Sequence, residues 1–185
     1  ETTPSHPNEV ITMATKKTSM FTLTERVTVS AAATDTFATI DLGSYVDVGD
    51  RQALQVHSVD FIFQGTTAGA DLQSDLGNGN EFHVQVTDLN RGALVFADDR
   101  ALVASGILAV DSNGGYHQEA DLYPDNYGKG SDDGRYVVND NLYITARLTG
   151  LVAACNVTVR VNASIVSLTA KDFMAIAIQS TAADN

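Results

Sequence analysis

The chain has 185 residues and a formal net charge of −12, from 23 acidic and 11 basic residues. This length allows one well-buried core but is short for two, and no stretch approaches the roughly 20 apolar residues that cross a membrane as a helix. Such acidity argues against direct nucleic-acid binding, which requires a basic face.

The balance within each charge type is also unusual. Aspartate outnumbers glutamate by 18 to 5, and arginine outnumbers lysine by 7 to 4. So large a net charge weakens a compact fold by self-repulsion unless salt screens it, and at about 1 M salt the Debye length is only about 3 Å. The composition therefore indicates a protein for a very salty medium; an ordinary acidic extracellular domain is the alternative. The single cysteine, Cys155, excludes an internal disulfide and is expected to be a small buried residue.

The N-terminal part of the chain changes character at residue 21. Residues 1–20 are polar, contain two of the three prolines and show no periodicity, which predicts an extended arm that is ordered only against a partner. Strict apolar-polar alternation then begins, and it predicts strands at residues 21–29, 37–42 and 54–63. The parity of the apolar residues changes within the third strand, which predicts a β-bulge or bend near His57 and Ser58.

Two long segments without periodicity interrupt the rest of the chain, at residues 65–80 and 111–135. Both are rich in glycine, aspartate and asparagine, as loops are. Residues 171–179 fit a short helix or a further strand, and the pattern does not separate the two. The remaining strands are expected at residues 82–86, 93–97, 101–110, 142–148 and 157–165.

Eight strands without a convincing long helix predict an all-β protein. The uneven loops favour a single eight-stranded jelly-roll β-sandwich with a polar N-terminal arm. The expected organisation is an arm at residues 1–20, a jelly-roll domain at residues 21–170 and a C-terminal tail at residues 171–185. An immunoglobulin-like sandwich is the alternative, although the chain lacks that fold's cysteine pair and tryptophan.

One cluster of oxygen ligands in the first long loop is a candidate cation site. Carboxylate and amide oxygens are the ligands that calcium uses, and the candidate residues are Asp71, Asp75, Asn80 and Glu81. The spacing is not that of an EF-hand, and a chain this acidic produces such clusters without a metal. The four histidines match no metal motif. Apart from this structural cation, no cofactor is expected.

No motif for catalysis is present. The chain lacks G-x-S-x-G, a P-loop and H-E-x-x-H, so no catalytic residue and no enzymatic activity are expected. Asn156 and Asn162 each fit the N-glycosylation pattern. Both lie on the polar face of one expected strand, where a sugar would block packing, so a chance match is favoured.

Candidate interface residues lie in the arm and in the second long segment. Tyr116, Tyr123 and Tyr127 accompany glycine and aspartate there, a combination that suits a loop packing against a neighbouring chain; packing on its own sandwich is the alternative. Lys16 and Lys17 are candidates for contact with lipid headgroups, worth roughly 2 kcal/mol at most. A solvated arm is the competing interpretation.

Three segments carry a resemblance to a known family: MFTLTERVTVS, LQVHSVDFIFQ and NLYITARLTGLVAACNVTVRVNASIVSL. In pattern, length and composition the chain resembles the single jelly-roll major capsid proteins of tailless icosahedral haloarchaeal viruses that enclose an inner membrane. It is similar in size to the smaller of the two major capsid proteins of those viruses.

The resemblance implies a jelly roll standing upright in pseudo-hexameric capsomers over a lipid vesicle. The implied partners are further copies of the chain, a larger related jelly-roll capsid protein, penton or minor capsid proteins, and the inner membrane. The implied location is the virion, after assembly in the host cytoplasm. Two other classes remain open: a secreted carbohydrate-binding or adhesive β-sandwich, which the absence of tryptophan disfavours, and a cupin-like enzyme, which the histidine placement disfavours.

Overall fold

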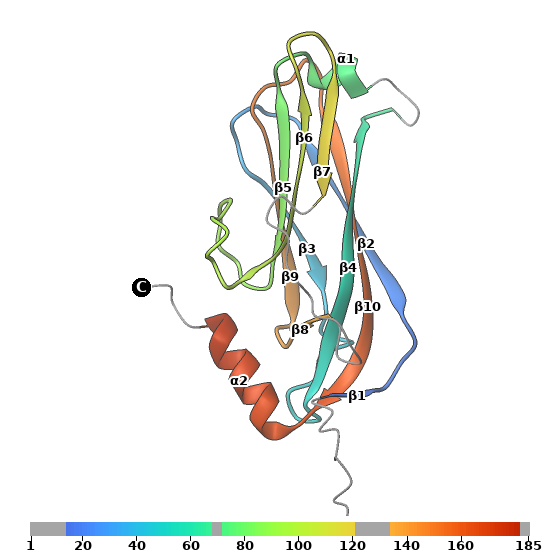
Figure 1. Ribbon diagram of the computed structural model, residues 1–185, viewed down its shortest axis with the longest axis vertical. Helices are drawn as coiled ribbons and strands as arrows, with labels where there is room; N and C mark the ends of the chain where they lie inside the picture. Colours follow the sequence, from blue (N-terminus) through green and yellow to red (C-terminus); the bar gives the residue numbers. More distant parts are fainter. Residues whose placement is uncertain (1–13, 68–71, 121–133, 182–185) are drawn as a thin grey trace, which may run out of the picture.

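The computed structural model describes residues 14–67, 72–120 and 134–181, and within these ranges the chain forms two antiparallel sheets that pack face to face (Figure 1). Sheet I contains β1 (Ala14–Lys16), β2 (Phe21–Val29), β4 (Gln52–Gly65), β8 (Arg135–Val137) and β10 (Cys155–Leu168). Sheet II contains β3 (Thr36–Asp41), β5 (Glu81–Thr87), β6 (Leu102–Val110), β7 (Tyr116–Ala120) and β9 (Asn141–Leu148). Two helices complete the described fold, α1 (Leu72–Leu76) and α2 (Ala170–Thr181).

The strand order is that of a jelly roll. Without the edge strands β1 and β7, eight strands remain, which can be counted from one to eight along the chain. In sheet I the neighbouring strands are the first, eighth, third and sixth of these (β2-β10-β4-β8). In sheet II they are the second, seventh, fourth and fifth (β3-β9-β5-β6). This is the two-sheet arrangement of two Greek keys. The predicted all-β jelly-roll sandwich is therefore confirmed.

The two extra strands lengthen the sheets at their edges. β1 pairs with the last residues of β10 and β2 pairs with its first nine, so β1 and β2 lie end to end along one edge of β10. β1 falls within the segment predicted as an arm, and its three residues are part of sheet I. β7 pairs with β6 at the edge of sheet II.

One predicted strand is wrong, and three strands lie where none was expected: β1 in the predicted arm, and β7 and β8 in the second long segment. Residues 93–97 form no strand, because both backbone polar groups of Val95 bond to the side chain of Gln85 rather than to a neighbouring strand. The missing jelly-roll strand is β8, which lies with β7 inside the segment predicted to be irregular. β8 has only three residues, too few to show periodicity.

The predicted bulge is present in β4. In the pairing with β10, Asn162 lies opposite Ser58 and Ala163 opposite Val56, which leaves His57 as the extra residue. A single inserted residue reverses which face the following side chains point to. Apolar residues on both sides of the bulge therefore reach the same core.

Apolar side chains fill the space between the sheets. The largest fully buried ones include Leu42, Leu54, Phe82, Leu142 and Ile144. Cys155 is buried among them, as expected, and burial raises the pKa of its thiol to about 11. None of the three histidines on the sheets belongs to this core. His57 Nε2 lies 2.9 Å from Ser164 Oγ, His83 Nε2 lies 2.9 Å from Glu81 Oε2, and His117 on β7 is exposed.

Residues 171–179, whose sequence pattern fits either a helix or a strand, lie in the helix α2. Thr169 caps it, because its Oγ accepts a hydrogen bond from the Asp172 backbone N–H at 3.2 Å. Phe173 then packs with Ala53, Val138, Val166 and Leu168 in a second apolar cluster. The helix thereby packs against one end of the outer face of sheet I.

Several aspartates close the turns between strands. Asp41 Oδ1 accepts from the Gly43 N–H at 2.8 Å, Asp47 Oδ1 from the Gly49 N–H at 2.8 Å, and Asp111 Oδ1 from the Asn113 N–H at 2.7 Å. These are Asx turns, which need the short side chain of aspartate or asparagine. Turn chemistry therefore accounts for part of the excess of aspartate over glutamate.

Candidate functional site

The outer face of sheet II is crossed by the loop at residues 88–101, which joins β5 to β6. Gln85, on β5, is buried beneath it. Its Nε2 donates to the Val95 carbonyl at 2.9 Å, and its Oε1 accepts from the Val95 N–H at 2.7 Å. One side chain thus satisfies both backbone groups of Val95 and holds the middle of the loop on the sheet.

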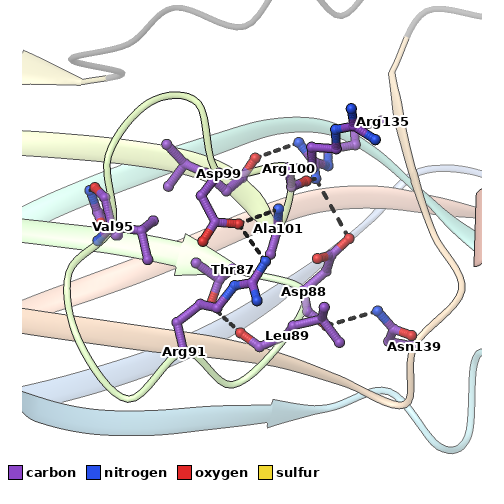
Figure 2. Close-up of polar contacts among 12 residues, drawn as sticks. Thr87, Asp88, Leu89, Arg91, Val95, Asp99, Arg100, Ala101, Arg135 and Asn139 are labelled. Carbon is purple, nitrogen blue, oxygen red and sulfur yellow. Dashed lines mark hydrogen bonds and ion pairs between the residues drawn. The ribbon is translucent and has the colours of Figure 1, made fainter. Parts of the chain in front are cut away.

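Short polar contacts brace the two ends of the loop (Figure 2). Arg91 Nη2 donates to Asp99 Oδ1 at 2.7 Å, and the same oxygen accepts from the Ala101 N–H at 2.8 Å. Near β5, Thr87 Oγ1 donates to the Leu89 carbonyl at 2.8 Å. The loop is therefore a fixed part of the surface.

A buried carboxylate lies at the base of the loop. Asp88 is 2 % exposed, and its Oδ2 lies 3.6 Å from Arg135 Nη2 on β8. Its Oδ1 is buried with no hydrogen-bond partner among the described residues. Burial raises the pKa of Asp88 to about 6, outweighing the attraction of Arg135, which acts in the opposite direction.

Arg135 connects this carboxylate to the rest of the loop. Its Nη2 also donates to the Arg100 carbonyl at 2.5 Å, and its Nη1 donates to the Leu102 carbonyl. Asn139 Nδ2 donates to the Asp88 carbonyl at 2.9 Å (Figure 2). Asp88 and Arg135, together with Ile176 of α2, line a cavity of about 180 Å³. The cluster joins the loop, β8 and the C-terminal helix.

Two hollows flank the loop on the same outer face. The first, of about 270 Å³, lies over β5 and β6 and includes Phe96 in its lining. The second, of about 310 Å³, lies over β3 and β9 and is lined by Phe37 and Tyr143, with Asn90 and Gly92 from the loop. Phe96 is 83 % exposed and Phe37 is 54 % exposed. Neither phenylalanine was predicted as a site residue, because apolar residues in alternating segments look like core.

The outer face of sheet I is polar where α2 does not cover it. Thr28 Oγ1 donates to Asn156 Oδ1 at 2.6 Å, and Asn156 Nδ2 donates to the Gly65 carbonyl at 3.1 Å. Thr22 and Ser58 bind Asn162 in the same way, at 2.8 and 2.9 Å. In both asparagines the Nδ2 atom, which would carry a glycan, is occupied by hydrogen bonds across the sheet. This geometry favours a chance match to the glycosylation pattern.

The candidate cation ligands have other partners where the structure describes them. Asn80 Nδ2 donates to the Leu76 carbonyl at 2.8 Å, and Glu81 Oε2 pairs with His83. Asp75 lies on α1, and Asp71 lies outside the described residues. Within the described ranges no group of three or more His, Cys, Asp or Glu side chains is arranged to hold a metal ion. The structural cation stays a prediction.

The candidate interface residues are partly described. Tyr116 lies on the edge strand β7 and is 47 % exposed, whereas Tyr123 and Tyr127 lie outside the described residues. Lys16 lies on β1, and Lys17 Nζ donates to Gln52 Oε1 at 3.3 Å. Their roles in an interface or at a membrane stay predictions. Among the described residues, no helix has the length and apolar character needed to span a bilayer.

Comparison with known proteins finds similarity among solved structures. No protein-family model and no curated protein matches the chain. A solved chain described as Desmodium yellow mottle tymovirus is similar at a TM-score of 0.33 and 11 % identity, over 91 % of this chain and 97 % of that one. A TM-score this low does not establish a shared arrangement of strands. The fold assignment therefore rests on the strand order itself.

Proposed function

We propose that this chain is a structural major capsid protein, which forms pseudo-hexameric capsomers in the icosahedral shell of a halophilic archaeal virus over an inner membrane. In this role it is the smaller of two related jelly-roll subunits. Its partners are further copies of itself, the larger subunit, and penton or minor capsid proteins. It resides in the virion after assembly in the host cytoplasm.

One observation carries the proposal: the space between the two sheets is filled by apolar side chains. Jelly rolls serve as capsid subunits, lectins and cupins, and a cupin needs metal ligands inside the sandwich. Here His57 and His83 both have partners outside the core. A jelly roll whose interior is filled by side chains can bind partners only through its outer surfaces, as a shell subunit does.

The charge supports a salt-dependent assembly. Each copy carries a formal net charge of −12, so neighbouring copies repel one another until salt screens them. The Debye length falls from about 30 Å at 0.01 M to about 3 Å at 1 M. Association is therefore expected at high salt and dissociation on dilution.

The test is mass photometry of the purified chain, alone and mixed with the larger subunit, in about 1 M and about 0.01 M NaCl, which bracket strong and weak screening. We expect oligomers at high salt that dissociate at low salt while circular dichroism still shows folded sheet. A chain that remains monomeric at every salt and protein concentration would contradict the proposal and favour a carbohydrate-binding or adhesive module. Oligomers that persist at low salt would contradict the role given to charge.

A further inference from the structure

Phe96 is an exposed ring on a fixed support. It is 83 % exposed, although the preceding residue, Val95, is held by Gln85 and the Phe96 carbonyl accepts from the Asp99 N–H at 3.1 Å. Because the backbone that carries the ring is already held in place, only the side-chain torsions of Phe96 lose freedom when the ring is buried against a partner. Rings of this kind are typical anchors at the centres of interfaces.

The same face carries a hollow that suits such a ring. The hollow over β3 and β9 has a volume of about 310 Å³, and the rings of Phe37 and Tyr143 contribute to its lining. An apolar cavity of about 150 Å³ is enough to hold benzene. The hollow therefore has room for a phenyl ring.

Phe96 does not fill the hollow of its own copy. Its ring lines the other hollow, over β5 and β6, whereas the hollow of Phe37 and Tyr143 is bordered by Asn90 and Gly92 of the loop. An exposed ring and a partly aromatic hollow thus border the same loop on the outer face of sheet II, and the ring does not line that hollow within the copy. A second copy provides a hollow for the Phe96 ring of the first copy and a Phe96 ring for its hollow.

We propose that two copies of this chain pack with the outer faces of their sheets II together, and that Phe96 of each copy enters the hollow of Phe37 and Tyr143 on the other. A ring and a hollow on one face form a reciprocal contact when a two-fold axis relates the copies. The proposal rests on the proposed function, for which it names one contact between subunits. Because both copies are acidic, the contact forms at high salt.

The first test measures dimerisation by sedimentation equilibrium in about 1 M NaCl, where the Debye length is about 3 Å. Phe96→Ser removes the ring from an exposed position, so folding is unaffected. Because the variant homodimer lacks both rings, we expect association about 700-fold weaker, which corresponds to roughly 2 kcal/mol for each of two interface anchors at 1.4 kcal/mol per tenfold. The matched control is Val152→Ser, which removes an apolar side chain that is 74 % exposed at another site.

A mixing experiment separates the reciprocal contact from general stickiness. Thr39 is exposed and lies on β3, next to Phe37 and Tyr143 at the hollow, so Thr39→Arg blocks the hollow and retains Phe96. Neither Phe96→Ser nor Thr39→Arg alone is expected to dimerise. An equimolar mixture has one intact ring facing one intact hollow, and we expect it to form a 1:1 dimer that is weaker than the wild-type dimer.

Cross-linking locates the contact. Cys155 is buried, so an introduced cysteine is the only thiol at the surface of the described residues. A mixture of Ala97→Cys and Thr39→Cys proteins, treated with a short bis-maleimide, is expected to give a covalent dimer. Adding Phe96→Ser to both proteins removes both rings and should abolish the product. Replacing Thr39→Cys with Thr24→Cys, on sheet I, should give none.

Several results would overturn the inference. Phe96→Ser protein that dimerises as tightly as wild type, or a mixture that does not associate, contradicts the reciprocal contact. If Thr39→Arg weakens association and Phe96→Ser does not, another segment or another protein occupies the hollow. In each case, wild-type assembly at high salt leaves the proposed function standing. A wild-type chain that is monomeric under all conditions contradicts both proposals.

Discussion

The two sheets are covered on their outer faces by different kinds of contact. α2 covers part of sheet I through an apolar cluster, in which Phe173 is 5 % exposed. The loop at residues 88–101 covers sheet II through polar contacts, above all the pair of hydrogen bonds between Gln85 and Val95. One cover is held by burial of apolar area and the other by directed bonds.

This difference has physical consequences. Apolar burial is non-directional and does not depend on the protonation state of any group. Hydrogen bonds and ion pairs fix geometry, and they leave a buried charge at Asp88 whose cost depends on pH. The polar cover therefore holds Phe96 in a defined position and makes this part of the molecule sensitive to pH.

The largest effect is expected at the apolar cover. Phe173→Ala should lower the free energy of unfolding by about 3–5 kcal/mol, because it removes a buried ring and leaves a cavity between α2 and sheet I. Urea denaturation followed by circular dichroism at high salt measures the change. Met174→Ala, at a neighbouring position that is 58 % exposed, should cost less than about 0.5 kcal/mol. Equal effects at the two positions would contradict the docking of α2.

The second prediction concerns pH and the buried charge. The pKa of Asp88 is raised from 3.8 to about 6 in the folded protein. Between these values the folded state binds more protons than the unfolded state, so the contribution of this group is full below pH 3.8 and is lost as the pH rises through 6. The loss amounts to about 3 kcal/mol.

Asp88→Asn isolates that contribution because it cannot ionise. We expect the free energy of unfolding of the variant, relative to that of the wild type, to rise by about 3 kcal/mol from pH 3 to pH 7. Urea unfolding of both proteins across this pH range measures the difference. Most of the gain is expected below about pH 6. A difference that does not change with pH would show that Asp88 titrates normally.

A smaller loss is expected at the support of the loop. Gln85→Ala removes both side-chain bonds to Val95 and should cost about 2 kcal/mol, at roughly 1 kcal/mol for each bond. It should also weaken the proposed dimer, because Phe96 is no longer held in place. Gln64→Ala is the control, since Gln64 is an exposed glutamine on β4, and it should change stability by less than about 0.5 kcal/mol. Similar losses for the two variants would argue against a specific role for Gln85.

The smallest effect is expected on the polar part of sheet I. Thr28→Val keeps the shape of the side chain and removes the hydroxyl that donates to Asn156 Oδ1 at 2.6 Å. The expected loss is about 1 kcal/mol. Thr24→Val, at an exposed position on the same face of β2, should have almost no effect. A loss equal to that of the control would mean that water replaces the lost bond without cost.

Local alternation was enough to predict most of the strands and the bulge. Two-residue periodicity located β2, β4, β9 and β10, and the change of parity placed a bulge near His57 and Ser58, where the strand pairing leaves His57 as the inserted residue. It could not locate β8, which has three residues, or reject residues 93–97, whose apolar composition suits a strand. Those outcomes depend on partners distant in sequence: β4 for β8, and Gln85 for Val95.

The candidate functional residues were equally hard to predict from local sequence patterns. Composition predicted an acidic protein without a catalytic motif, and the candidate residues were taken from loops rich in aspartate and tyrosine. The structure instead draws attention to Phe96, Phe37 and Asp88. In the sequence, an exposed phenylalanine is indistinguishable from a core phenylalanine, and a buried aspartate from any other.

By itself, the sequence determined most of the long strands, the alternation of buried and exposed positions along them and the total charge, because these follow from neighbouring residues and from composition. Only the tertiary structure decided which strands pair, where the outer faces are covered and which aromatic ring is left exposed. Those properties depend on contacts between residues far apart in the chain. Packing alone decides whether a given ring lies in the core or on the surface.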